Sequence, residues 1–177
     1  MGPEVTCNIG LEPQFMTELA YLSLGSNVGD RAAHLKSAIA QLQAAEKLRA
    51  VSGFCETQPV DVTNQPWFLN CVLALETDKT PRQLLDLAIK IERGMGRTRL
   101  SDKGPRNIDI DIVLFGDSVI NEAGLDIPHP AMAQRRFVLQ PLAEIAPEAM
   151  HPTLKKTARE LLAALPEGQE VRRMEKP

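Results

Sequence analysis

Apolar residues recur along the chain with two different periods, and these periods predict its secondary structure. Four short runs are rich in apolar, β-branched and aromatic residues and are bounded by turn-forming residues, as is typical of strands. They occupy residues 19–24, 49–60, 66–77 and 107–117. The first run is followed directly by Gly25, Ser26 and Asn27, which predict a turn at that point.

A helical period appears between the first two strands. Asp30 is placed to cap a helix that continues to about residue 48. Its apolar positions fall three and four residues apart, so they form one stripe, which comprises Leu35, Ala38, Ile39 and Leu42.

The second predicted helix, over residues 80–96, carries stronger local signals. Thr80 suits the N-cap, Pro81 the first turn, and Gln83 the position from which a capping box returns its hydrogen bond. Gly94 and Gly96 predict its end.

The order of these elements predicts the fold class. The pattern β-α-β-β-α-β is the split βαβ arrangement, an α+β fold with a four-stranded antiparallel sheet and both helices on one face. A small hairpin in "SVINEAGLDIPHP" and a last helix in "TLKKTARELLAAL" follow it. The 177 residues suit one domain, expected over 19–177. Residues 1–18 show no periodicity and are expected to form a flexible N-terminal extension.

Composition narrows the class of protein. A net charge of −3 argues against nucleic acid as the main partner. The chain has neither a signal-peptide pattern nor an apolar run long enough to span a bilayer, so we expect no membrane partner and a cytoplasmic protein. Its three cysteines lack metal-ligand spacing, which fits reduced thiols.

The last predicted strand contains two carboxylates in an otherwise apolar run, "NIDIDIVLF". Side chains alternate across a strand, so one predicted face holds Ile108, Ile110, Ile112 and Leu114 and packs under the helices. The opposite face carries Asn107, Asp109, Asp111, Val113 and Phe115. Asp109 and Asp111 are therefore neighbours on the same face, where burial is costly unless a positive charge compensates it.

A basic segment precedes the acidic pair and suggests which kind of ligand neutralises the two carboxylates. "RGMGRTRLSDKGPR" holds Arg93, Arg97, Arg99, Lys103 and Arg106. Oxygen ligands suit magnesium, which commonly completes its shell with substrate phosphates, and Arg grips phosphate oxygens. The pattern favours a site for a nucleotide polyphosphate, with the loop beyond Gly96 as a lid. The alternatives are a merely solvated strand face for the acidic pair, and an Arg93 that only complements the helix dipole.

Five motifs of the chain together resemble those of a known family. "YLSLGSN", "ETQPV", "PWFLN", "GPRNIDIDIVLFGD" and "IPHPAMAQRRFVLQPL", in this order, are similar to 6-hydroxymethyl-7,8-dihydropterin pyrophosphokinases. The resemblance covers nearly the whole chain from Leu19. It implies a ferredoxin-like fold and the transfer of pyrophosphate from ATP to the hydroxymethyl group of the pterin in folate biosynthesis, with release of AMP. It also implies that small molecules are the partners and that the enzyme is a monomer or weak homodimer.

The resemblance further implies roles for individual residues. Asp109 and Asp111 match the ligands of two magnesium ions, and Arg97 and Arg106 match further catalytic positions. Positions that contact or close over the nucleotide are Glu92, Arg99, Ile112, His129 and Arg135. Positions around the pterin are Thr57, Pro59, Val60, Phe68, Asn70 and Phe137. Lys103 departs from the family, because many relatives carry an aromatic residue there.

The residues themselves support part of this assignment. Phe68 and Asn70 lie two apart in a predicted strand and so face the same way, one suited to stack on a flat ring and the other to bond its rim. Trp67 would face the opposite side, in the core. The alternatives for Phe68 and Phe137 are plain core packing, and for His129 a structural loop role.

Two other functions remain open from the sequence. One is a noncatalytic ferredoxin-like module that binds a nucleotide and signals through a partner. The other is a different magnesium-dependent phosphoryl or nucleotidyl transferase. An ordinary P-loop NTPase is excluded, because the chain has no Gly-rich loop ending in Gly-Lys-Ser/Thr.

Overall fold

The structure, a computed structural model, describes residues 16–59, 64–97 and 104–174. Its centre is one antiparallel sheet with the strand order β5-β1-β4-β3-β8, in which β2 also pairs with β4. The strands of this sheet are β1 (Glu18–Ser26), β2 (Lys47–Val51), β3 (Cys55–Thr57), β4 (Phe68–Thr77), β5 (Asp109–Phe115) and β8 (Val171–Arg173). The strand order β5-β1-β4-β3 and the two crossover helices confirm the predicted split βαβ pattern.

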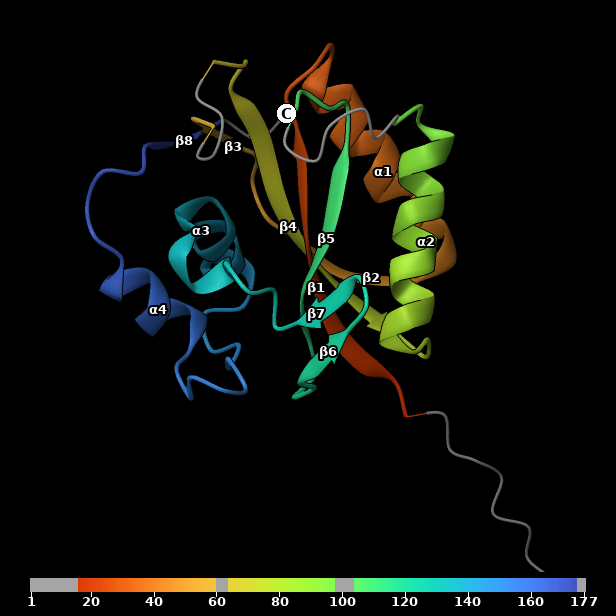
Figure 1. Cartoon of the computed structure of the whole chain (residues 1–177), viewed down its shortest axis with the longest axis vertical. Coiled ribbons are helices and arrows are strands. Elements are labelled where there is room, and N and C mark those ends of the chain that lie inside the picture. The colour runs from red at the N-terminus through yellow and green to blue at the C-terminus, as the bar shows by residue number, and fades with distance from the viewer. Residues whose placement is uncertain (1–15, 60–63, 98–103, 175–177) are drawn as a thin grey trace, which may run out of the picture.

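Helices α1 (Arg31–Ala45) and α2 (Pro81–Gly94) cover one face of the sheet, as predicted (Figure 1). Asp30 caps α1 by accepting the N–H of Ala33, and Thr80 and Gln83 form a complete capping box on α2. The apolar stripe of each helix packs on β1, β4 and β5 in the larger core. Local sequence signals thus suffice to start both helices.

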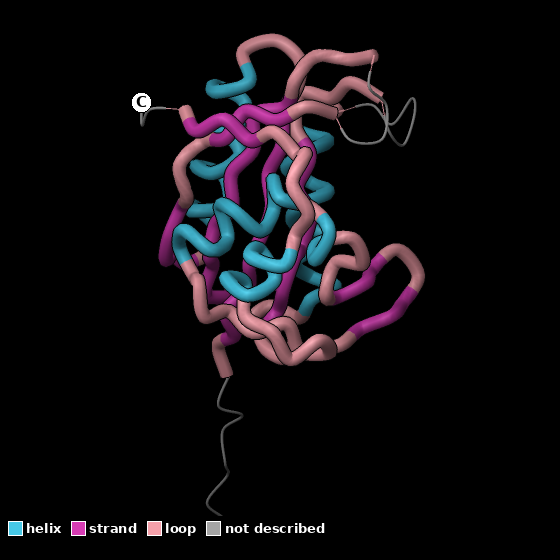
Figure 2. The backbone as a smooth tube through the Cα atoms, turned by 90° about the vertical axis from the view of Figure 1, so that its left-hand side faces the viewer, coloured by secondary structure: helices cyan, strands magenta, loops and turns pink. Residues whose placement is uncertain are grey.

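The opposite face is covered only in part. Helix α3 (Arg136–Ile145) and the short helix α4 (Ala158–Ala164) pack on one end of it, around Val72, Val113 and Leu114 (Figures 1 and 2). The hairpin of β6 (Ile120–Glu122) and β7 (Leu125–Ile127) precedes them, with the 3-10 turn Met132–Gln134 between. No helix in the described part of the chain covers the other end of this face, and its residues line a pocket. Among the described residues, no helix has the length and apolar character that crossing a bilayer requires.

The predicted alternation along β5 holds only as far as Val113. The pairing of β1 with β5 shifts between Tyr21 and Leu22, so that Ile112 and Leu114 oppose adjacent residues of β1 and Val113 is the extra residue. After such a bulge, each side chain of the strand points to the face of the sheet opposite to the one that simple alternation predicts. Leu114 therefore packs in the second core and Phe115 in the first, the reverse of the prediction.

Several boundaries also differ from the prediction. Gly25 and Ser26 belong to β1, where Gly25 pairs with both Asn70 and Asp109, so the predicted turn there is wrong. Trp67 is half-exposed just before β4 rather than in the core, and the guanidinium of Arg172 lies over its ring at 4.5 Å. Helix α3 and strand β8 had no predicted counterpart.

The second predicted strand is divided into β2 and β3. Ser52 lies at the break, where its hydroxyl accepts the N–H of Val72 and keeps β4 paired. The N-terminal segment 1–18 was expected to be an extension, but Glu18 already pairs with Thr77 in β1. Residues 1–15 lie outside the described part of the chain.

Candidate active site

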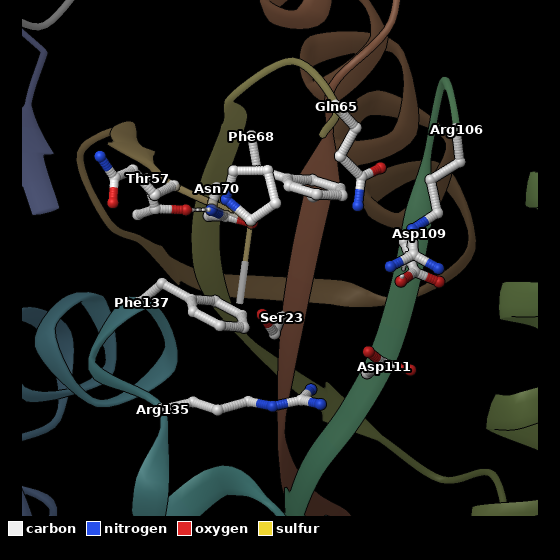
Figure 3. A pocket seen from close by; sticks show the side chains of 13 residues that line it. Ser23, Thr57, Gln65, Phe68, Asn70, Arg106, Asp109, Asp111, Arg135 and Phe137 are labelled. Carbon is white, nitrogen blue, oxygen red and sulfur yellow. Dashed lines mark hydrogen bonds and ion pairs between the residues drawn. The ribbon is translucent and has the colours of Figure 1, made fainter. Parts of the chain in front are cut away.

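A pocket opens at the uncovered end of the sheet, between β5 and the start of α3 (Figure 3). Its empty space, including the part open to solvent, is about 610 Å³. Two aromatic rings lie on one side and two carboxylates on the other. A guanidinium group lies near each ring, Arg106 at 5.4 Å from the centre of Phe68 and Arg135 at 5.6 Å from that of Phe137. The lining residues are Ser23, Gly25, Thr57, Gln58, Pro59, Gln65, Phe68, Asn70, Arg106, Asp109, Asp111, Arg135 and Phe137.

One half of the pocket combines two rings with a fixed amide. Phe68 at the start of β4 and Phe137 in the first turn of α3 line the pocket and lie apart in Figure 3, with Asn70 behind them. The Asn70 side chain is buried and donates to the Thr57 hydroxyl at 2.7 Å. This arrangement suits a flat heterocycle with hydrogen-bonding groups on its edge.

Asn70 keeps its place because Gly25 leaves room for it. A Cβ atom on Gly25 would lie 2.7 Å from Asn70 Oδ1, closer than carbon and oxygen can approach. Sequence reasoning placed Gly25 in a turn and missed this role. The next motif residue, Asn27, is buried and accepts the N–H of Arg106 at 2.8 Å while donating to Gln65 at 3.0 Å. It therefore ties two pocket-lining segments to the end of β1.

The charged half is built around Asp109. Arg97 Nη1 lies 2.6 Å from Asp109 Oδ1, and Arg106 Nε lies 3.3 Å from Oδ2. Arg97 also pairs with Glu92 Oε1 at 2.5 Å, and the same oxygen accepts the N–H of Ile110 at 2.7 Å. Glu92 thus connects the end of α2 to both β5 and Arg97. The two arginines thus compensate the Asp109 charge, whereas the sequence predicted magnesium and phosphate in that role.

Asp111 is in a different electrostatic position. Partial burial raises the pKa of its carboxyl group, and the nearby Asp109 and Glu92 carboxylates raise it further; Arg135 and Arg106 oppose these effects. A carboxylate that burial and its neighbours disfavour is well suited to bind a cation, which would restore its charged form. Figure 3 shows the Arg135 guanidinium extended across the pocket toward this group.

The acidic pair fits a metal site that is completed by substrate. In the described residues there is no group of three or more His, Cys, Asp or Glu side chains placed to hold a metal ion. Asp109 and Asp111 supply only hard oxygen ligands from one strand, so a cation there needs water or phosphate oxygens for the rest of its shell. Magnesium commonly binds in this way.

A second hollow meets the first at Asp111. It is lined by Leu85, Ile110, Asp111, Ile112, Gly124, Leu125, Asp126, His129 and Pro130. Burial and the charge of Arg135 lower the pKa of His129, which favours its neutral form, and its Nδ1 accepts the N–H of Ala131 at 3.2 Å. A ligand that occupies both hollows would therefore pass over the acidic pair.

The structure thus brings most of the predicted residues together. Nine line the first pocket: Thr57, Pro59, Phe68, Asn70, Arg106, Asp109, Asp111, Arg135 and Phe137. Ile112 and His129 line the second hollow. Arg97 contacts Asp109, whereas Glu92 is 4% exposed and lines neither hollow. Val60, Arg99 and Lys103 lie outside the described residues.

Comparisons with known proteins agree with this geometry. The sequence model of the family described as 7,8-dihydro-6-hydroxymethylpterin-pyrophosphokinase (HPPK) matches residues 21–147. The 2-amino-4-hydroxy-6-hydroxymethyldihydropteridine pyrophosphokinase of Methylorubrum extorquens is 43% identical over 154 residues, covering 85% of this chain and 96% of the relative. Folic acid synthesis protein fol1 of Schizosaccharomyces pombe is 42% identical over 151 residues, but the match covers 84% of this chain and only 21% of that protein.

A solved structure shows the same fold. The Plasmodium falciparum HPPK-DHPS crystal structure with pterin and p-hydrobenzoate superposes with a TM-score of 0.67 at 18% identity, covering 86% of this chain and 45% of that one. The match of the family model over more than half of the chain, together with near full-length similarity to the Methylorubrum protein, assigns the sequence. The chain belongs to the 7,8-dihydro-6-hydroxymethylpterin-pyrophosphokinase family.

Proposed function

We propose that this chain transfers pyrophosphate from ATP to the hydroxymethyl group of 6-hydroxymethyl-7,8-dihydropterin, releasing AMP, as a step of folate biosynthesis. The observation that carries the proposal is the position of Asp109 and Asp111. They stand beside an aromatic pocket with a fixed amide, and Asp111 also borders the second hollow. Family membership and the names of the relatives support the same activity.

The pterin would lie in the first pocket. Phe68 and Phe137 would stack on its ring, and Asn70 would bond its edge while Thr57 holds the amide in place. Pro59, which follows β3, would complete the rim. The resemblance to the family assigns Val60 to the pterin as well.

The nucleotide would extend from the second hollow to the acidic pair. Ile112 and His129 would contact it there, and Glu92 would act mainly by holding Arg97. Four arginines would bind or close over its phosphates: Arg97, Arg99, Arg106 and Arg135. Arginine suits this task because its planar group matches phosphate oxygens and stays charged.

Asp109 and Asp111 would hold two magnesium ions. When bound, magnesium neutralises phosphate charge and orients the reacting oxygens. The chain's own contribution is to place the hydroxymethyl group of the pterin in line with the β-phosphorus and to offer arginines to the transferred and leaving groups. The hydroxyl oxygen forms a bond to the β-phosphorus, the bond from that phosphorus to the bridging α-phosphate oxygen breaks, AMP leaves with that oxygen, and the hydroxyl proton passes to solvent.

The products and two variants test this function. Incubation with ATP, magnesium and the pterin should yield AMP and the pterin diphosphate; ADP as the nucleotide product would reject pyrophosphoryl transfer. Asp109→Asn and Asp111→Asn should each remove most magnesium-dependent turnover while thermal unfolding stays cooperative. Near-normal rates in both variants would contradict the metal role.

The same measurements separate the alternatives. A nucleotide sensor would bind ATP without any effect of the pterin and would form no product. A different transferase would not require the pterin as acceptor. The contact of Asn70 with Thr57 and the two rings favour the pyrophosphokinase.

We further propose that the protein is cytoplasmic and acts as a monomer or weak homodimer. Cys55 and Cys71 are buried, and burial raises the pKa of both thiols, that of Cys71 to about 12. Such thiols are poorly reactive, which fits a reducing compartment.

A further inference from the structure

The C-terminal segment 169–173 joins two walls of the pocket that are far apart in sequence. Its strand β8 pairs antiparallel with β3, with Val171 opposite Thr57 and Arg173 opposite Cys55. Strand β3 has only three residues, and β8 gives it a hydrogen-bonded neighbour on the side away from β4. The end of β3, where Thr57 lines the pocket, is therefore held between two strands.

Side chains of β8 fasten it at two further points. The guanidinium of Arg172 stacks on Trp67, the residue directly before Phe68, at 4.5 Å. Arg173 Nη2 lies 2.8 Å from Glu144 Oε2 of α3, and Glu144 Oε1 accepts the N–H of Gly53 at 3.1 Å. The strand is thus tied to β3, to the start of β4 and to α3.

Gln169 fastens the other wall. Its Oε1 accepts the N–H of Arg136 at 2.7 Å, and its Nε2 donates to the carbonyl oxygen of Gln134 at 2.8 Å. These two bonds flank Arg135, whose own side chain gives α3 no cap. An amide N–H in the first turn of a helix needs an acceptor from outside the helix, and here it comes from 33 residues farther along the chain.

The chain reaches this position through a glycine. Gly168 has a φ of 120°, a conformation that side-chain-bearing residues rarely adopt, and it directly precedes Gln169. One residue after Gln169 comes Glu170, and the next is Val171 of β8. A short stretch therefore holds both the beginning of α3 and the end of β3.

We propose that the segment 169–173 is a positioning strap for the pterin pocket, with Gln169 as its principal residue. Building on the proposed function, it sets where Arg135 and Phe137 stand relative to Thr57 and Phe68. Gln169 does not line the first pocket, so it acts through the backbone on either side of Arg135. The expected consequence is a larger effect on the pterin than on the nucleotide, because the second hollow is built from other elements and Arg135 is the phosphate-binding arginine next to the strap.

Gln169→Met tests the proposal, because methionine keeps the length of the side chain and removes both hydrogen bonds. Gln43→Met, at an exposed position of α1, is the matched control. Binding is measured by calorimetry, with the pterin titrated into protein saturated with magnesium and a non-hydrolysable ATP analogue. Losing two modest hydrogen bonds should raise the dissociation constant of the pterin about tenfold. That of the ATP analogue should rise clearly less, by no more than about threefold, because the strap reaches the phosphates through Arg135.

The outcomes separate this proposal from a purely structural role. Unchanged pterin binding by Gln169→Met would overturn it. So would a matched weakening of the pterin and the ATP analogue together with a large fall in the melting temperature. A wild-type protein that binds no pterin would overturn both this proposal and the proposed function, whereas wild-type binding that the substitution leaves unchanged would overturn this one alone.

Discussion

The substitution Gly25→Ala should weaken pterin binding while leaving the fold intact. The added Cβ would lie 2.7 Å from Asn70 Oδ1 and 3.6 Å from the Phe68 ring. Gly25 lies in the middle of the sheet, paired on both sides in an extended conformation that alanine also adopts. The backbone can therefore stay, and the Asn70 side chain has to move.

Moving Asn70 breaks its bond to Thr57. Both side chains are buried, at 4% and 3% exposure, and the bond is 2.7 Å long. Leaving a buried polar group without its partner costs about 1–3 kcal/mol. The edge of the pterin then no longer meets a fixed amide. If its binding free energy weakens by that amount, its dissociation constant rises about 5- to 150-fold.

Calorimetric titration of the pterin in the presence of an ATP analogue measures this directly. Gly53→Ala is the control, because a Cβ there would meet Glu144 oxygens at 3.6 and 3.7 Å, an ordinary contact distance. If Gly25→Ala binds the pterin as tightly as the wild type, or if Asn70 still contacts Thr57 in a structure of the variant, then Gly25 does not position Asn70.

Three further predictions concern stability. Glu92→Gln should lower the free energy of unfolding by about 1.5–3 kcal/mol in urea titrations, because Arg97 loses the more buried of its two counter-charges and keeps Asp109, while Ile110 keeps an acceptor. An unchanged midpoint would contradict the link between α2 and β5. Thr80→Ala removes half of a capping box and should cost about 1 kcal/mol, seen as a lower melting temperature. Burial lowers the pKa of His151, so the unfolded chain binds more protons and stability falls as the pH drops below about 6.5. His151→Asn should make this fall in stability shallower between about pH 7 and pH 5. An identical slope in wild type and variant would contradict this role of His151.

Local sequence signals predicted the elements that depend on near neighbours. The capping box on α2 involves residues three apart, and the apolar stripe on α1 repeats within a turn, so both can be recognised without any tertiary information. The common face of Asp109 and Asp111 also follows from their spacing in a strand. The family motifs added the pocket residues, most of which the structure brings together.

Helix α3 shows why other elements escaped prediction. It contains Pro141, and its N-cap residue makes no capping bond, so its local sequence argues against a helix. Burial of Val138, Leu139 and Leu142 in the second core stabilises it, and Gln169 supplies the missing acceptor. Both contributions come from residues that are distant in the chain.

Spacings of a few residues were enough to predict the split βαβ order, the two capped helices and the two carboxylates beside a basic segment. Tertiary structure alone decided that a bulge exchanges the faces of Leu114 and Phe115, that Gly25 is a strand residue beneath Asn70, and that β8 closes the sheet beside Thr57. These features depend on register and on contacts between distant segments. A local pattern carries no information about which backbone will lie next to it, so only the folded chain could settle them.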